Sequence, residues 1–221
     1  ATMPKRVLEL ADKHTINATH IEVVTEGETT ATIEHFKITI KDDGKQQLLQ
    51  DLVVVENPDS CIIFCRTKER VHDALYELEY SVDKLHGGME QSTRLLVMND
   101  FKRGEFRYLV ATDVAARGID IENITHVFNF DLPLEKEAYV HRTGRTGRAG
   151  LHGKAFTFVT PFEQDFLAGV EEYIGFSLKE THRPTSGAVL ANERAFDEKM
   201  DAAPKRKKMK LEAVNEGITR L

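Results

Sequence analysis

The sequence predicts an α/β protein with a mainly parallel sheet that is covered by helices on both faces. From about residue 33 onward, short apolar runs rich in β-formers alternate with longer segments of helical pattern, which is the order expected of βαβ units. The strands are expected at residues 33–40, 61–65, 81–85, 107–111, 125–130 and 154–159. The helices are expected between them, at residues 45–56, 68–79, 91–103, 134–142 and 163–174.

The helix expected from Gln91 illustrates the pattern. Its apolar residues cluster at helical spacing, and a glycine provides a stop. These residues are Leu95, Leu96, Met98 and Phe101, followed by Gly104.

The two ends of the chain differ from this regular middle. Residues 4–14 are expected to form a helix, with Pro4 near its start, where the missing N–H is tolerated. Residues 20–24 have a strand pattern and lead into a polar stretch. Beyond Gly175 we expect a polar segment, a helix over residues 189–200 and then a basic run.

The composition is ordinary for a globular protein, with 41% hydrophobic and 30% charged residues among 221. No apolar run approaches the roughly 18 residues that span a bilayer, and the N-terminus lacks a signal-peptide pattern. We therefore expect a cytoplasmic protein without membrane contact. The net charge of −6 does not suggest a general polyanion binder, but residues 141–154 and 205–210 are locally basic.

The two cysteines, Cys61 and Cys65, both fall within one expected strand. Four residues of strand separate them by about 13 Å, which is too far for a disulfide. Without a matching pair of His or Cys residues, a zinc site is not expected either. We interpret both as buried thiols in a reducing compartment.

Polar residues that suit phosphate follow most of the expected strands. Ligands of open α/β sheets bind beyond the carboxyl ends of the strands, so these positions carry the candidate site. They are 66–68 (RTK), 86–88 (HGG) with Gln91 and Arg94, 112–120 (TDVAARGID), and 131–133 (DLP) leading to 141–150 (HRTGRTGRAG). Hydroxyl, backbone N–H and guanidinium donors would then gather at one rim.

Taken singly, each group also has a structural explanation. Thr67 can cap the following helix, residues 86–88 can form a turn, and Arg117 and Asp120 can form a surface ion pair. The run 141–150 fits a solvated loop less well, because its arginines recur every third residue, each followed two positions later by a glycine that permits close approach.

In order and spacing these segments resemble the motifs of the second lobe of DEAD-box RNA helicases, which belong to helicase superfamily 2. The resemblance covers about residues 33–175 and rests on CIIFCRTK, HGGMEQSTR, ATDVAARGIDI and HRTGRTGRAG. It implies a RecA-like three-layer α/β/α domain over residues 31–180. Residues 1–30 would be a remnant of the first lobe and the interlobe linker, and residues 181–221 a helical and basic extension.

The resemblance also implies residue roles. Arg145 and Arg148 match the arginine fingers that reach the γ-phosphate of ATP, where fixed cations are needed. Gly118 and Asp120 match positions at the nucleotide, with Asp120 accepting from the ribose hydroxyls. His141 and Arg142 match the pair that couples the nucleotide site to the RNA site.

For RNA, the matching positions are Thr67, Gly87, Arg94 and Thr112. Their family counterparts contact phosphates and sugars, so binding through this lobe is expected to be independent of sequence. The chain contains no G-x-x-x-x-G-K-[ST] motif and no acidic Asp-Glu-Ala-Asp motif. ATP and Mg²⁺ would therefore be held mainly by the first lobe, and this chain alone is expected to be inactive.

The tail is similar to that of bacterial members that carry an appended RRM-type domain for ribosomal RNA, while residues 205–210 also fit a solvated linker. Two other functions stay open. A superfamily 2 DNA helicase would share the 112–120 segment, but such proteins usually have Gln in place of the pair His141 and Arg142. A non-catalytic RNA-binding module would not need Arg145, Arg148 and Asp120.

Overall fold

The computed structural model describes residues 5–16, 19, 32–66, 68–77, 80–116, 121, 124–148 and 150–202. The strands are β1 (Ile33–Thr39), β2 (Cys61–Phe64), β3 (Val82–Leu85), β4 (Tyr108–Ala111), β5 (His126–Asn129), β6 (Gly153–Val159) and β7 (Lys179–Glu180). The helices are α1 (Lys5–His14), α2 (Lys45–Glu56), α3 (Lys68–Glu77), α4 (Gln91–Lys102), α5 (Asp113–Ala116), α6 (Lys136–Thr143), α7 (Gln164–Ile174) and α8 (Ser186–Ala202).

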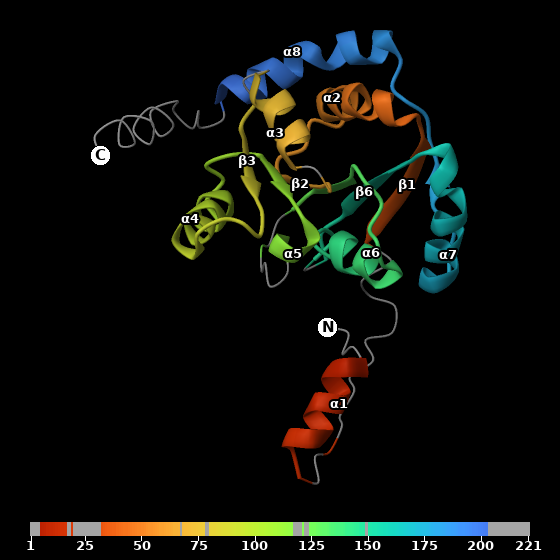
Figure 1. The fold of residues 1–221 in the computed structure, drawn as a ribbon. Coiled ribbons are helices and arrows are strands. Elements are labelled where there is room, and N and C mark those ends of the chain that lie inside the picture. The colour runs from red at the N-terminus through yellow and green to blue at the C-terminus, as the bar shows by residue number, and fades with distance from the viewer. Residues whose placement is uncertain are drawn as a thin grey trace.

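These strands form one parallel sheet in the order β3-β4-β2-β5-β6-β1-β7 (Figure 1). One face is covered by α2, α3 and α8, and the other by α4, α5 and α6 (Figure 1). Side chains from alternate strand positions enter two cores, one under α2, α3 and α8 and one under α4 and α5. A third cluster joins α6 to α7. The predicted three-layer α/β/α fold is confirmed.

Most predicted elements are confirmed to within one or two residues, and α2 has the bounds expected for it. Two differences have a clear local cause. α6 begins at Lys136 instead of residue 134 because Glu135 is still extended, with φ −127° and ψ 142°. α8 begins at Ser186 instead of residue 189, where the Thr185 hydroxyl accepts the N–H of Ala188. The strand expected at residues 20–24 lies outside the described residues.

The helix predicted near the C-terminus is joined to the core. Phe196 of α8 is 3% exposed and meets Tyr80 edge-on, with ring centroids 5.1 Å apart. Lys199 Nζ donates to the carbonyl of Asn57, which ends α2, at 2.8 Å. Residues 186–202 are therefore packed on the domain, whereas the basic run 205–210 lies outside the described part of the chain.

Cys61 and Cys65 are both buried and free, as predicted. Burial among apolar neighbours raises the pKa of the Cys61 thiol well above its ordinary value. Among the described residues, no helix has the length and apolar character needed to cross a bilayer.

Candidate functional site

Three of the residues predicted to contact RNA lie together at the carboxyl ends of β3 and β4. The N–H of Thr112 donates to the carbonyl of Leu85 at 3.3 Å, which joins the ends of the two strands. Arg94 Nη2 donates to the carbonyl of Ala115 at 2.8 Å. A Cβ atom added to Gly87 would lie 3.9 Å from Val114. We call Gly87, Arg94 and Thr112 the RNA-contact patch; Thr67, the fourth predicted member, lies outside the described residues.

The short helix α5 is the element that brings this patch together. The carbonyl of Thr112 accepts the N–H groups of Ala115 at 3.1 Å and Ala116 at 3.0 Å, so the chain turns directly after β4. Its four residues are too few to show helical periodicity. This turn holds Thr112 and the carbonyl that receives Arg94 in one rigid unit.

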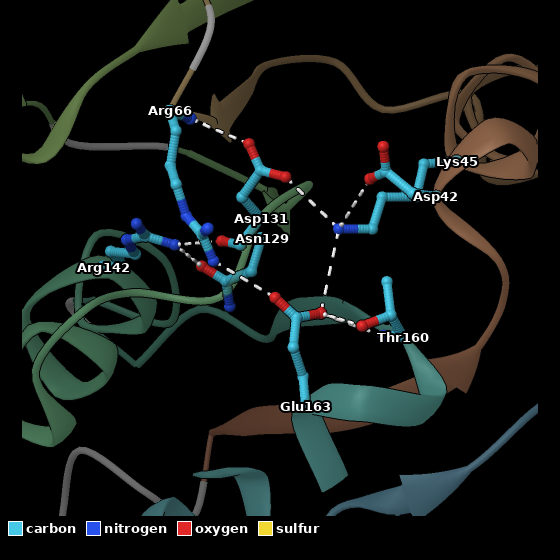
Figure 2. Close-up of polar contacts among 8 residues, drawn as sticks. All are labelled: Asp42, Lys45, Arg66, Asn129, Asp131, Arg142, Thr160 and Glu163. Carbon is cyan, nitrogen blue, oxygen red and sulfur yellow. Dashed lines mark hydrogen bonds and ion pairs between the residues drawn. The ribbon is translucent and has the colours of Figure 1, made fainter.

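Arg142 is buried, with 2% exposure, and Figure 2 shows two of its acceptors, which belong to Asn129 and Asp131. Its Nε and Nη2 form a bidentate pair with the Asp113 carboxylate at 2.6 and 2.8 Å. Its Nη1 donates to Asn129 Oδ1 at 3.3 Å and to the carbonyl of Asp131 at 2.6 Å. The guanidinium also lies 5.0 Å from the centroid of the Phe64 ring. Arg142 therefore ties α6 to the residue that follows Thr112.

Arg145 and Arg148 have a different environment, in the loop that follows α6. Their Nε atoms donate to the carbonyls four residues earlier, those of His141 at 3.2 Å and Gly144 at 2.8 Å. Both side chains are only partly buried. We call residues 144–148 the arginine loop.

The arginine loop lies at the amino ends of the strands. The hydroxyl of Thr146 donates to the carbonyl of Ile124, just before β5, at 2.5 Å. Gly147 has φ +67°, and a Cβ atom there would clash with Ile33 at the start of β1. Thr32 Oγ1 donates to the carbonyl of Gly147 at 2.8 Å. Glycine is thus required at position 147 both for its backbone conformation and for close approach.

The prediction that all of these groups gather at one rim is wrong for Arg145 and Arg148. α6 starts beyond the carboxyl end of β5 and runs back across the sheet, so the arginines that follow it reach the opposite edge. His141, in the last turn of α6, is exposed. Gly118 and Asp120 lie outside the described residues.

A buried chain of polar side chains leads from Arg142 into the sheet. Asn129 Nδ2 donates to Thr157 Oγ1 at 3.1 Å. The hydroxyl of Thr157 forms a hydrogen bond with that of Tyr139. The Tyr139 hydroxyl also forms a hydrogen bond with His35 Nδ1, at 2.9 Å. We call His35, Tyr139, Thr157 and Asn129 the buried relay. These residues are absent from the predicted site, although a polar residue within each of two apolar strands (HVFN and AFTFV) marks part of the chain in the sequence.

The far end of the relay is shielded from water. His35 is 7% exposed, its Nε2 has no hydrogen-bond partner among the described residues, and the Phe176 ring lies edge-on at 5.0 Å. Burial lowers the pKa of His35 to about 4 from its usual 6.5. Burial also raises the pKa of Tyr139. The relay is therefore uncharged near neutral pH.

A second polar network lies beside Arg142 at the carboxyl edge (Figure 2). The Lys45 side chain is 2% exposed, and its Nζ lies 3.2 Å from Asp131 Oδ1 and 3.9 Å from Glu163 Oε2. Asp131 Oδ2 accepts the backbone N–H of Arg66 at 2.8 Å, and Glu163 Oε1 accepts from the Arg66 guanidinium at 3.1 Å. A buried cation is tolerated because carboxylates surround it. The network fixes the loop in which Arg66 precedes Thr67.

Comparison with known proteins places this geometry in a family. Residues 44–150 match the helicase conserved C-terminal domain. The ATP-dependent RNA helicase DbpA of Bacillus subtilis is 55% identical over 100% of this chain and 47% of its own length. The DEAD-box ATP-dependent RNA helicase CshA of Bacillus licheniformis is 39% identical over 88% of this chain and 40% of its own length. The chain thus spans less than half of these two relatives.

Solved structures agree with this placement. The DEAD-box protein SrmB of E. coli, crystallised with the regulator of ribonuclease activity A, is 34% identical, with a TM-score of 0.61 over 71% of this chain and 93% of that one. S. cerevisiae Dbp5 bound to RNA and ADP BeF3 is 28% identical, with a TM-score of 0.73 over 90% of this chain and 53% of that one. The sheet order, the ordered motifs and these similarities lead to one conclusion: the chain belongs to the DEAD-box helicase family and forms its RecA-like C-terminal lobe.

Proposed function

We propose that this chain is the half of an ATP-dependent RNA helicase that contacts the RNA backbone and supplies arginine fingers for RNA-stimulated ATP hydrolysis and local duplex unwinding. The observation that carries the proposal is the bidentate bond between Arg142 and Asp113, at 2.6 and 2.8 Å. Asp113 follows Thr112 of the RNA-contact patch, and Arg142 lies on α6, which leads into the arginine loop. The bond therefore joins the patch to α6.

On the RNA side, the patch offers a hydroxyl, a guanidinium and a glycine backbone at one edge of the sheet. These groups suit phosphates and sugars and do not read base identity. The similar protein Dbp5 has been solved with RNA, and we carry that ligand over to the patch as part of the proposal. Thr67 would complete the patch.

On the nucleotide side, Arg145 and Arg148 would contact the γ-phosphate of ATP bound to the other lobe. Two features of the loop fit this role: guanidinium groups are permanently charged, and these two are partly exposed on a loop fixed by Thr146 and Gly147. Gly118 and Asp120 would contact the nucleotide as well. Mg²⁺ would be held mainly by the first lobe and would neutralise phosphate charge there.

The two proposed sites lie at opposite ends of the strands, and α6 connects them. RNA and ATP would therefore act through α6 to favour the same closed arrangement of the two lobes. Closure would be a hinge-type change driven by tighter binding of both ligands to the closed state. His141 and Arg142 would couple the sites, with Arg142 as the fixed element. A non-catalytic RNA-binding module would have no use for this connection.

Two finer parts of the proposal concern the whole protein. An appended RRM-type domain would direct the enzyme to ribosomal RNA, as the resemblance of the tail implies. The protein would act in the cytoplasm. Residues 1–30 would belong to the first lobe and the linker, residues 31–180 to this lobe, and residues 181–221 to an extension.

The test is RNA-stimulated ATP hydrolysis by this chain alone and by the same chain joined to its first lobe. We expect no turnover from the chain alone and RNA-dependent turnover from the joined protein. Turnover by the isolated chain would require a complete nucleotide site within it and would refute the half-site proposal.

A further inference from the structure

Phe162 projects from the carboxyl edge of the sheet and is 96% exposed. It lies in the short 3-10 helix Pro161–Glu163 that follows β6. The turn is rigid, because Glu163 Oε2 accepts from the N–H and the hydroxyl of Thr160 at 3.0 and 2.8 Å, and Pro161 restricts the backbone. An aromatic ring of this size is normally largely buried, so a rigid turn that presents it to solvent suggests a binding role.

An open pocket of 590 Å³ lies beside this ring, between the turn after β1, the end of β2 and the turn after β6. Arg66 forms one wall, and Glu163 Oε1 holds its guanidinium at 3.1 Å while the side chain stays 52% exposed. Lys41 and Asp43 line the side nearest β1. A planar cation and an aromatic ring therefore border the same space.

The pocket and the RNA-contact patch both lie at the carboxyl ends of the parallel strands. The N–H of Cys65 donates to the carbonyl of Ala111 at 3.1 Å, so the segment with Arg66, just after β2, begins beside the end of β4, where Thr112 follows. Beyond β2, the next strands in the sheet are β5, β6 and β1, and the pocket lies at their carboxyl ends. Neighbouring strands are about 4.8 Å apart, so the far side of the pocket is roughly 19 Å from Thr112. A single RNA strand that leaves the patch along this edge would reach it.

The charge of the pocket indicates which part of the RNA it would take. Three lysine or arginine side chains and four carboxylates line it, so it does not attract phosphate. Stacking on an aromatic ring and a guanidinium is instead the way in which proteins hold unpaired bases. Carboxylates at the rim can accept hydrogen bonds from the amino groups of a base.

We propose that this pocket binds an unpaired nucleobase of the RNA strand that leaves the RNA-contact patch, with the base stacked on Phe162 beside Arg66. The inference rests on the proposed function, because the RNA strand is the one held by Gly87, Arg94 and Thr112. It adds a base contact through Phe162, which lies outside the motifs that carry the family resemblance.

The chain contains no tryptophan, so Phe162→Trp introduces one fluorescent reporter at the pocket. The probes are a short oligoadenylate and an abasic oligomer of the same length. We expect oligoadenylate to quench the indole of this variant saturably and the abasic oligomer to leave it unchanged. Leu190→Trp, at a 70% exposed position of α8, is the control that neither oligomer should quench.

Phe162→Ala should weaken oligoadenylate binding to the chain at least about fivefold, because stacking on an aromatic side chain contributes that much or more for each base. Phe162→Tyr should preserve it. Binding is measured by the fluorescence anisotropy of labelled oligomer, so it is independent of the reporter. Since Phe162 touches so little of the protein, neither change should affect folding.

The outcomes separate the two proposals. Oligoadenylate that binds with normal affinity while the Phe162→Trp indole stays unquenched would overturn the base pocket and leave the proposed function intact. If Arg94→Ala failed to weaken binding while quenching persisted, the RNA-contact patch would be wrong; the pocket would still bind a base, but the claim that the base belongs to a strand leaving the patch would be overturned.

Discussion

Arg142 and the pair Arg145 and Arg148 belong to one basic run, yet their surroundings differ sharply. Arg142 is 2% exposed and makes four hydrogen bonds to Asp113, Asn129 and the Asp131 carbonyl. Arg145 and Arg148 are partly exposed, and each Nε donates to a carbonyl one helical turn earlier.

Arginines that are regularly spaced in the sequence therefore need not have the same role in the structure. A guanidinium whose donors are used inside the protein can fix α6 but cannot reach a ligand without leaving its partners unpaired. The two that follow α6 remain near the surface, on a loop that glycine and threonine hold in place. We therefore expect loss of Arg142 to affect mainly folding, and loss of Arg145 or Arg148 mainly catalysis.

The largest expected effect comes from Arg145→Lys in the protein with both lobes. RNA-stimulated hydrolysis should fall about 10³-fold or more, because lysine cannot reproduce the planar charge of an arginine finger. RNA affinity should be nearly unchanged. Steady-state turnover with saturating RNA measures the first effect, and a binding titration measures the second.

Arg194→Lys is the matched control for that change, since Arg194 is a 91% exposed residue of α8 that pairs with Glu198. Its turnover should equal that of the unchanged protein. Full activity in Arg145→Lys would mean that Arg145 is not an arginine finger.

The next largest effect is on folding. Arg142→Met should reduce the free energy of unfolding by about 3 kcal/mol or more, because it leaves the buried Asn129 side chain, the partly buried Asp113 carboxylate and the Asp131 carbonyl without their donor. Arg148→Met should reduce it by less than about 1 kcal/mol. Urea unfolding of the chain measures both. Equal losses in the two variants would mean that Arg142 stabilises the fold no more than Arg148 does.

Much of the fold could be predicted because each long element carries its own periodic pattern. α2 illustrates this, since it begins and ends where its pattern does. α5 and β7 could not be predicted, because they have four and two residues and are formed by contacts with other elements. The bounds of α6 depend on the extended Glu135, which no local pattern marks.

The location of the predicted site residues could be foreseen only in part. Gly87, Arg94 and Thr112 come together as expected because parallel strands end at one edge. The arginine loop lies at the other edge, because α6 carries the chain back across the sheet before β6. The buried relay went unrecognised because one polar residue in an apolar strand identifies no partner until the strands are paired.

The buried relay makes the stability of the domain depend on pH. Burial lowers the pKa of His35 to about 4, whereas in the unfolded chain it would have its usual value near 6.5. Between these values the unfolded state binds a proton that the folded state does not. The stability that His35 contributes is thus fully present above about pH 6.5 and declines as the pH falls toward 4, by up to about 3 kcal/mol.

His35→Gln cannot titrate and should flatten this pH dependence by that amount. The measurement is the free energy of unfolding in urea at several pH values. His72, whose pKa is also lowered mainly by burial, contributes in the same direction, so the difference between the unchanged chain and His35→Gln is the informative quantity. Identical slopes for both would mean that His35 is not shielded at the end of the relay.

The smallest expected effect comes from Tyr139→Phe, which removes the hydroxyl between Thr157 and His35 and preserves the ring. The free energy of unfolding should fall by about 1–2 kcal/mol, because two buried groups lose a hydrogen-bond partner. If the relay helps to hold α6, RNA stimulation of hydrolysis in the protein with both lobes should also fall, while the affinity for RNA stays constant. A matched change is Tyr173→Phe on α7, where the side chain is 46% exposed and neither quantity should change. Loss of stability with normal stimulation would confine the relay to folding and leave Arg142 alone as the link between the two sites.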